Sequence, residues 1–258
     1  STDINKYSEI VLFGLDLMRN QGLFWEPGVA QLFFNIFFFL EAFIVKRNKW
    51  LLIVSVIVII TTYSTIGILI LLLQLLYYFF FELSSKFGVL IFCIVALPIS
   101  SVFLFNVAEK TTGDKEASFQ KRYFDLVQPF FIAIENPLTG IGLDLYKFQE
   151  YRYEFYVDPS DYSLIEENIG LDLKMDNTNE GSSNSFMFLL AAMGFPTGIF
   201  MFWLFLNQQI IKKRRLLFLL ILSLSLFSSP LLLRPFFMFL MFSGFFYFIL
   251  KLGRFQKH

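Results

Sequence analysis

Hydrophobic positions in this chain are gathered into long blocks, which are separated by short polar connections and by one long polar stretch. A membrane-spanning helix needs about 20 predominantly apolar residues, and seven blocks approach that length. They predict spans at residues 28–45, 50–64, 66–82, 87–106, 185–211, 216–229 and 236–250. Only the polar run Thr61-Thr62-Tyr63-Ser64-Thr65 divides the second span from the third, and we expect a turn there. The pattern therefore predicts an all-α, polytopic transmembrane helix bundle.

The long polar stretch, residues 107–183, contains a periodic apolar pattern of its own. Apolar side chains recur at helical spacing at Phe119, Tyr123, Leu126, Val127, Phe130, Phe131 and Ile134. A single apolar face of this kind is typical of a helix that lies in the membrane interface. Asn136-Pro137 is expected to end this helix, and Gly140-Ile141-Gly142 predicts a tight turn after it.

These blocks divide the chain into three parts within a single membrane domain. We predict an amino-terminal transmembrane part at residues 1–106 with four spans, and a large loop at 107–183. A carboxyl-terminal transmembrane part follows at 184–258 with three spans.

The charges are sorted by sign between the two kinds of connection. The loop at 107–183 holds 15 of the 21 acidic residues against seven basic ones, a net charge of −8. Lysine and arginine collect at 46–49, at 212–215 and in the carboxyl-terminal tail. By the positive-inside tendency those basic sites are cytoplasmic, which places residues 1–27, the loop at 107–183 and residues 230–235 outside. We expect a multi-pass membrane protein, and the carboxyl-terminal part of a larger one.

Several kinds of chemistry are excluded by composition. The only histidine is His258 and the only cysteine is Cys93, so the chain has neither a His/Cys metal cluster nor a Cys–His pair. The sequence contains neither GxGxxG nor GxxxxGK[ST], the glycine-rich motifs that bind phosphate groups. We expect no metal, no cofactor and no nucleic-acid partner.

Arginine on the outer side is the strongest candidate for chemistry, because positive charge is scarce there. Arg19, Arg122, Arg152 and Arg234 all lie in segments predicted to be outside. A guanidinium suits a bidentate grip on phosphate oxygens, although a salt bridge to the acidic loop is an equal alternative for each of them. Polar residues within spans, such as Asn35 and Gln74, are more simply explained by interhelical hydrogen bonds.

Four short motifs, taken in order, resemble those of the O-antigen polymerase and O-antigen ligase superfamily of bacterial integral membrane glycosyltransferases. The first two resemblances are Arg19, Gly22 and Pro27 before a span, and Thr62, Ser64 and Gly67 in a small-polar signature. The third is Arg122 followed by Asn136-Pro137-Leu138-Thr139-Gly140-Ile141-Gly142-Leu143, and the fourth is Asn184 with Gly194. The resemblance extends from Arg19 to about residue 245.

The resemblance implies a location in a bacterial cytoplasmic (inner) membrane, a substrate, and roles for residues. The donor would be an oligosaccharide on undecaprenyl pyrophosphate, and the partners a glycan acceptor, the lipid bilayer and, as a further candidate, a chain-length regulator. Arg19, Arg122 and Arg234 would stabilise the departing pyrophosphate, and Glu180 is the candidate base. Candidates for substrate binding are Asn184, Gly140, Gly142, Arg152, Tyr151 and Tyr153.

One departure from the family pattern bears on the reaction. Many ligases carry a histidine where this chain has Ser183, and a serine hydroxyl cannot act as a base unaided. This departure favours a polymerase of O-antigen or capsular polysaccharide over a ligase that transfers glycan to a surface acceptor. A flippase or other lipid exporter, and a non-catalytic scaffold or sensor, are the alternatives from other classes.

Overall fold

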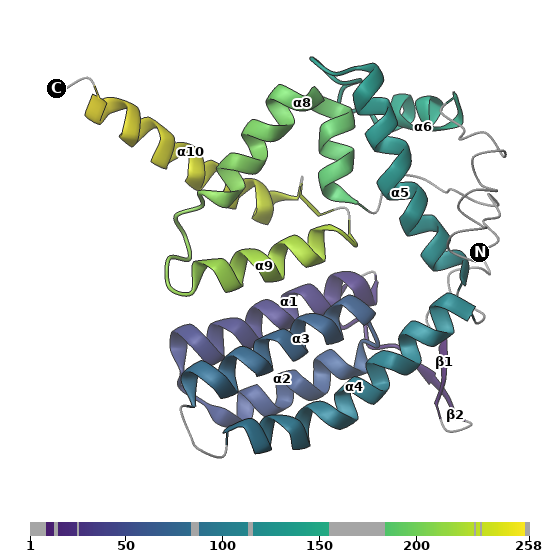
Figure 1. Ribbon diagram of the computed structural model, residues 1–258, viewed down its shortest axis with the longest axis vertical. Helices are drawn as coiled ribbons and strands as arrows, with labels where there is room; N and C mark the ends of the chain where they lie inside the picture. Colours follow the sequence, from purple (N-terminus) through teal and green to yellow (C-terminus); the bar gives the residue numbers. More distant parts are fainter. Residues whose placement is uncertain are drawn as a thin grey trace. The chain divides into compact units, whose positions relative to one another are not determined.

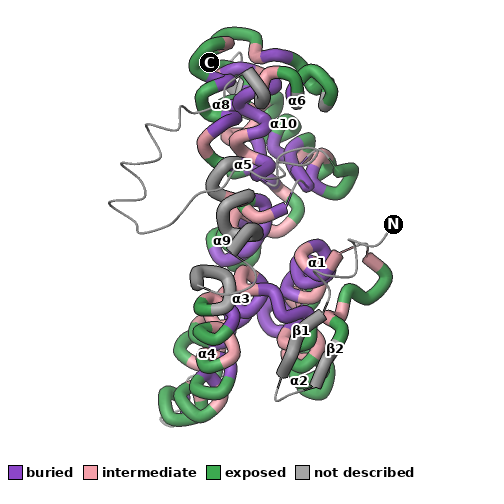
Figure 2. Tube along the Cα trace, turned by 90° about the vertical axis from the view of Figure 1, so that its right-hand side faces the viewer, coloured by how far each residue is buried: buried purple, intermediate pink, exposed green. Residues whose placement is uncertain are grey.

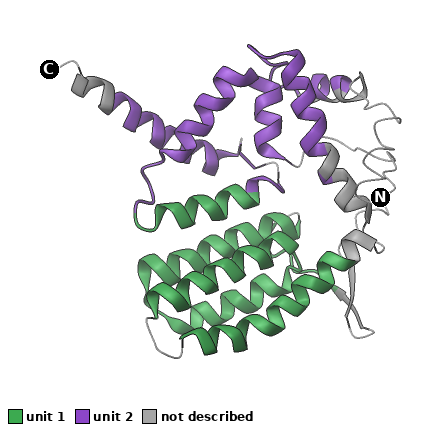
Figure 3. Ribbon diagram, in the orientation of Figure 1, with its two compact units in different colours: residues 1–109, 213–225 green, residues 110–212, 226–258 purple. Residues whose placement is uncertain are grey.

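The computed structural model describes residues 9–12, 15–24, 26–83, 88–112, 116–154, 184–229, 231–232 and 234–255. Helices dominate these residues, in agreement with the predicted all-α bundle. One element was not predicted: a short antiparallel hairpin of β1 (Glu9–Leu12) and β2 (Leu15–Met18), in which Glu9 pairs with Met18. The chain forms two compact units, which are coloured separately in Figure 3.

The first unit comprises residues 1–109 and 213–225. Its helices are α1 (Pro27–Phe39) with the π-helical turn η1 (Leu40–Val45), α2 (Lys49–Thr61), α3 (Thr65–Tyr77) with the π-helical turn η2 (Tyr78–Glu82), most of α4 (Gly88–Thr112), and α9 (Arg215–Leu226). Helix α1 packs against α2 and α3, beside which it lies in Figure 1. Helix α9 joins this unit through Phe218, whose ring lies 5.2 Å from that of Phe39.

The outer helices of this unit are apolar on their exposed sides. In Figure 2 most of α4 is exposed, and only 17% of its most apolar window is buried, against 61% for α1 with η1. Leu90, Ile94 and Leu97 of α4 are more than half exposed. In a protein with spans of this length, such surfaces face lipid rather than water.

The second unit comprises residues 110–212 and 226–258. Its helices are α5 (Glu116–Glu135), α6 (Leu145–Glu154), α8 (Ser185–Leu206) and α10 (Pro235–Phe255). Helix α8 packs along α5 on one side and against α10 on the other. A buried cluster joins α5, α6 and α8, consisting of Ile132, Ile141, Phe148, Phe188, Ala191 and Ala192.

The predicted spans correspond to helices, with changed ends and one interruption. Four helical segments are long and apolar enough to cross a membrane, at 27–45, 65–82, 88–108 and 185–206, and three shorter apolar helices lie at 49–61, 215–226 and 235–250. The span predicted at 185–211 ends early, because Asn207 and Gln208 turn their amides onto the backbone of Trp203 and Ile211. It is also broken at Gly194, where φ is 71° and ψ is 172°. The count of seven crossings stays a prediction.

Candidate functional site

The first two sequence motifs meet at the turn between α2 and α3. Ser64 caps α3 by accepting a hydrogen bond from the N–H of Gly67, while Tyr63 holds the turn with a φ of 51°. The guanidinium of Arg19 donates to the carbonyl oxygens of Thr62 and Tyr63, at 3.1 and 3.2 Å. Since the carboxyl end of a helix leaves carbonyls without partners, Arg19 stabilises the end of α2.

Two neighbours reinforce this turn. Asn20 next to Arg19 donates from its N–H to the carbonyl of Thr61 and from its side-chain amide to the Thr61 hydroxyl, both at 2.9 Å. From α4, Asn106 donates a second hydrogen bond to the carbonyl of Tyr63 at 2.8 Å. The residues approaching the first span are therefore fastened to the turn that was predicted between the second and third spans.

A chain of amide side chains lies deeper in the same unit. Gln74 of α3 donates to Asn35 of α1 at 2.8 Å, and Asn35 donates to the side chain of Gln31 and to the carbonyl of Gly67. All three amide side chains are fully buried. The interhelical hydrogen bond expected for Asn35 and Gln74 is thus confirmed, and it ties α1 to α3.

The third and fourth motifs meet in the second unit, at the break in α8. Pro196 has no N–H to donate, so a straight helix would leave the carbonyl of Ala192 without its usual partner. The chain after α5 supplies the donors instead: the N–H of Ile141 bonds to the carbonyl of Ala191 at 3.0 Å, and that of Gly142 to Ala192 at 2.8 Å. In return, the N–H of Phe195 donates to the carbonyl of Pro137 at 2.8 Å.

Glycine is required at two positions of this junction. A Cβ at Gly140 would lie 2.4 Å from the backbone of Ala192, and one at Gly194 would lie 2.6 Å from the backbone of Leu138. Both glycines have positive φ, at 63° and 71°. The two backbones approach more closely than any side chain permits, which explains why both motifs contain glycine.

The start of α8 is connected to the segment that carries Arg234. Asn184 caps α8 by accepting hydrogen bonds from the N–H groups of Phe186 and Met187. The hydroxyl of Ser185 donates to the carbonyl of Ser229 at 2.6 Å and accepts from the N–H of Leu231 at 2.9 Å. Arg234 is exposed three residues later and begins α10, because its carbonyl accepts from Phe237 and Met238.

Arg122 lies on α5 at the end nearest to Asn184. The segment after α5 pairs with the break in α8, so α5 and the first half of α8 run in the same direction (Figure 1). Ile132 and Ala192 share one buried cluster. A helix rises about 1.5 Å per residue, so along α5 Arg122 precedes Ile132 by about 15 Å. Along α8, Asn184 precedes Ala192 by about 12 Å. These spacings place Arg122 and Asn184 toward the same end of the second unit, and Ser185 connects that end to the segment before Arg234, whereas Arg19 belongs to the first unit.

The sequence pattern did not predict that two polar residues of α5 are buried. Asp125 and Gln128 are almost fully buried, whereas Leu126, Phe130, Phe131 and Ile134 on the predicted apolar face are 39–47% exposed. The helix predicted from that face is confirmed, and its position in the membrane interface stays a prediction. The signal that could have found Asp125 and Gln128 is their spacing from Arg122, at i+3 and i+6, on the opposite face.

The remaining candidates have different surroundings. Tyr151 of α6 is half-buried against the cluster around Phe148, and Arg152 and Tyr153 follow it in the same helix. Glu180 lies outside the described residues. Among the residues that the structure describes, no three His, Cys, Asp or Glu side chains converge on a point where a metal ion could bind.

The fold and this site define a helical membrane protein with several candidate spans, in which the loop after α5 bonds to the backbone of α8 where that helix is broken. A family model described as O-antigen ligase matches residues 50–202, more than half of the 258-residue chain. The chain belongs to this family, which confirms the predicted membership of the O-antigen polymerase and ligase superfamily. It is therefore an integral membrane enzyme of glycosyltransferase type. Comparisons with curated proteins and with solved structures give no match.

Proposed function

We propose that the chain is an O-antigen or capsular polysaccharide polymerase, which transfers an oligosaccharide from undecaprenyl pyrophosphate to a glycan acceptor at the outer leaflet. The observation that carries this proposal is the family match, which includes both motifs folded together at the α8 break. A ligase that transfers the glycan to a surface acceptor is the second candidate, and the Ser183 position favours the polymerase over it.

The reaction needs two things from the protein. The acceptor hydroxyl attacks the anomeric carbon while the bond from that carbon to the pyrophosphate oxygen breaks, and the hydroxyl proton passes to a base. Glu180 is the candidate base. Charge grows on the departing pyrophosphate, and preorganised guanidinium groups stabilise such charge. Arg122 and Arg234, which share one end of the second unit, are the first candidates for this role, and Arg19 is the third.

Substitution of these arginines tests the site. Removal of one such donor lowers kcat about 100- to 1,000-fold in other enzymes, so we expect losses of that order for Arg122→Ala and Arg234→Ala. Lysine at the same positions keeps the charge but not the planar fork, and should recover only part of the activity. Lys147→Ala, an exposed change in α6, is the matched control. Normal turnover in both alanine variants would exclude the proposed roles.

We also propose that these guanidinium groups, rather than a metal ion, carry the charge of the leaving group. Purified enzyme treated with EDTA should then retain its rate of transfer. Loss of activity with EDTA, followed by recovery when Mg²⁺ or Mn²⁺ is added, would contradict this part of the proposal.

Deletion of the gene in its native host separates the candidate functions. Surface polysaccharide and lipid-linked sugars would be run on one gel. Accumulated single repeat units indicate a polymerase, whereas long chains that remain on the lipid carrier indicate a ligase. An unchanged pattern in a host without a redundant copy would contradict both.

A further inference from the structure

A small cavity lies at the end of the first unit that is predicted to be cytoplasmic. Its volume is about 180 Å³, room for several water molecules of about 30 Å³ each. Its polar lining comes from the ends of three helical segments: Glu41, Lys46, Asn48, Lys49, Tyr78 and Glu82. A cavity that mixes carboxylates with ammonium groups suits a ligand that itself carries both charges.

Glu41 presents a buried carboxylate to this cavity without a cation of its own. Its residue is 7% exposed. One oxygen, Oε1, accepts from the N–H groups of Arg47 and Asn48. The other oxygen, Oε2, has no hydrogen-bond partner among the described residues. This oxygen is not among the buried atoms without a partner and is therefore open to the cavity, so an ammonium group from outside the chain would form a charge-assisted hydrogen bond with it.

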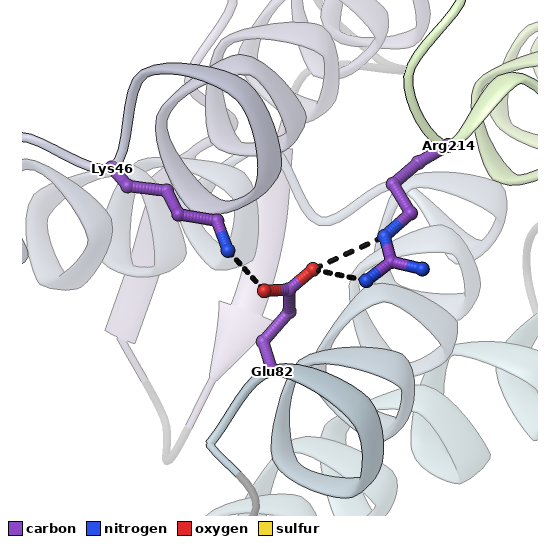
Figure 4. Close-up of polar contacts among 3 residues, drawn as sticks. All are labelled: Lys46, Glu82 and Arg214. Atoms are coloured by element: carbon purple, nitrogen blue, oxygen red, sulfur yellow. Dashed lines mark hydrogen bonds and ion pairs between the residues drawn. The ribbon is translucent and has the colours of Figure 1, made fainter.

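One of the two lysines that line the cavity, Lys46, is already paired with another carboxylate. One carboxylate oxygen of Glu82 forms an ion pair with Lys46 (Figure 4). The other oxygen accepts hydrogen bonds from Nε and Nη2 of Arg214, at 3.1 and 2.9 Å. The Glu82 side chain is only 8% exposed and therefore holds both cations closely. Lys46 is thereby directed toward Glu82 and leaves Glu41 to a different partner.

The opposite charge has its own receptors beside Glu41. Lys49 forms no ion pair within the described residues, and the amide nitrogen of Asn48 donates to no described residue. Asn48 caps the amino end of α2 by accepting from the N–H of Trp50, and helix amino ends favour phosphate. The cavity thus offers a carboxylate for an ammonium group and, a few residues away, Lys49, Asn48 and a helix end for a phosphate.

We propose that this cavity binds a phosphoethanolamine group, supplied by the headgroup of phosphatidylethanolamine in the adjoining leaflet. Glu41 receives the ammonium group, and Lys49 with Asn48 receives the phosphate. The lipid is the source because the cavity is lined by residues near the ends of the apolar segments 27–45 and 65–82, and the ends of spans of that length are expected to meet the headgroup layer. This site is separate from the proposed glycosyl transfer and does not depend on it.

Native mass spectrometry of the full chain, released from detergent after incubation with one lipid at a time, tests the site. Phosphatidylethanolamine should be retained about tenfold more strongly than phosphatidylcholine or phosphatidylglycerol of the same acyl chains, the factor expected for one charge-assisted hydrogen bond. Glu41→Gln should abolish this preference, because glutamine keeps the oxygen acceptor for the two N–H groups but loses the charge. Lys49→Gln should weaken retention of all phosphate headgroups.

Matched controls and competing results keep the test decisive. Glu150→Gln and Lys147→Gln, two exposed changes in α6, should leave the preference unchanged. Equal retention of the three lipids, or a preference that survives in Glu41→Gln, would overturn the proposal. Free phosphoethanolamine should displace the lipid. If it binds while the lipid does not, the headgroup chemistry stands but the membrane source is wrong, which overturns the proposal as stated.

Discussion

At the scale of single residues, the site depends on where a side chain is absent as much as on where one is present. Gly140 and Gly194 allow the loop after α5 to lie directly on the backbone of α8, and the N–H of Gly142 then reaches the carbonyl of Ala192. The functional candidates Arg122 and Asn184 lie at the other end of the same pair of helices. The spacing between Arg122 and Asn184 therefore depends on the contact of the loop after α5 with α8, in which neither residue takes part.

Replacement of these glycines by alanine should separate steric from conformational effects. Gly140→Ala and Gly194→Ala should each destabilise the protein by about 2–4 kcal/mol, the sum of a left-handed backbone and a clash with backbone atoms. Gly142→Ala is the matched control, since its φ is 93° but nothing lies within 4 Å of the added Cβ. Thermal unfolding in detergent measures the difference, and equal losses at all three positions would contradict the role assigned to the close approach.

At the scale of elements, one carboxylate joins segments that are distant in the sequence. Glu82 at the end of η2 binds Lys46 after η1 and Arg214 before α9 (Figure 4). The guanidinium of Arg214 also lies 5.4 Å from the centre of the Tyr77 ring. The hydrogen bond to Glu82 raises the pKa of Arg214, a side chain that is already charged at physiological pH. These contacts attach α9 to the helices of the first unit.

Loss of the Glu82 charge should therefore loosen α9 from its neighbours. We expect Glu82→Gln to lower stability by about 1 kcal/mol, because Lys46 and Arg214 are partly exposed and water screens such pairs. A double-mutant cycle with Arg214→Gln, followed by thermal unfolding, isolates the interaction between the two side chains. A coupling energy near zero would show that α9 is held by its apolar contacts, such as Phe39 with Phe218, alone.

At the scale of the whole molecule, the sorted charges predict which parts face which side of the membrane. The chain has a single cysteine, Cys93, so a Cys93→Ala background permits one new cysteine at a time. Lys147→Cys in α6 should react with a membrane-impermeant maleimide in intact cells, whereas Lys213→Cys should react only after the cells are opened. Labelling of both, or the reverse pattern, would contradict the predicted topology.

The sequence was sufficient for the helices but not for their contacts. Polar residues within a long apolar run predicted the turn at Thr61–Thr65, because a polar cluster is unfavourable in lipid, and α2 and α3 indeed end and begin there. The break in α8 was not predicted, although Gly194-Phe195-Pro196 contains its signal, because an apolar run shows length and not straightness. Burial of Asp125 and Gln128 could not be predicted either, because helical periodicity identifies an apolar face but not which face meets another helix.

The broken helix also has a consequence for how the protein is made. The carbonyls of Ala191 and Ala192 obtain their donors from Ile141 and Gly142, which lie about fifty residues earlier in the chain. The ribosome therefore completes the donor loop before the accepting helix, so the partners for these two carbonyls already exist when α8 is made. A rearranged chain with the loop encoded after α8 would have the same contacts available at the end, but it would have to insert that helix with its backbone incompletely bonded.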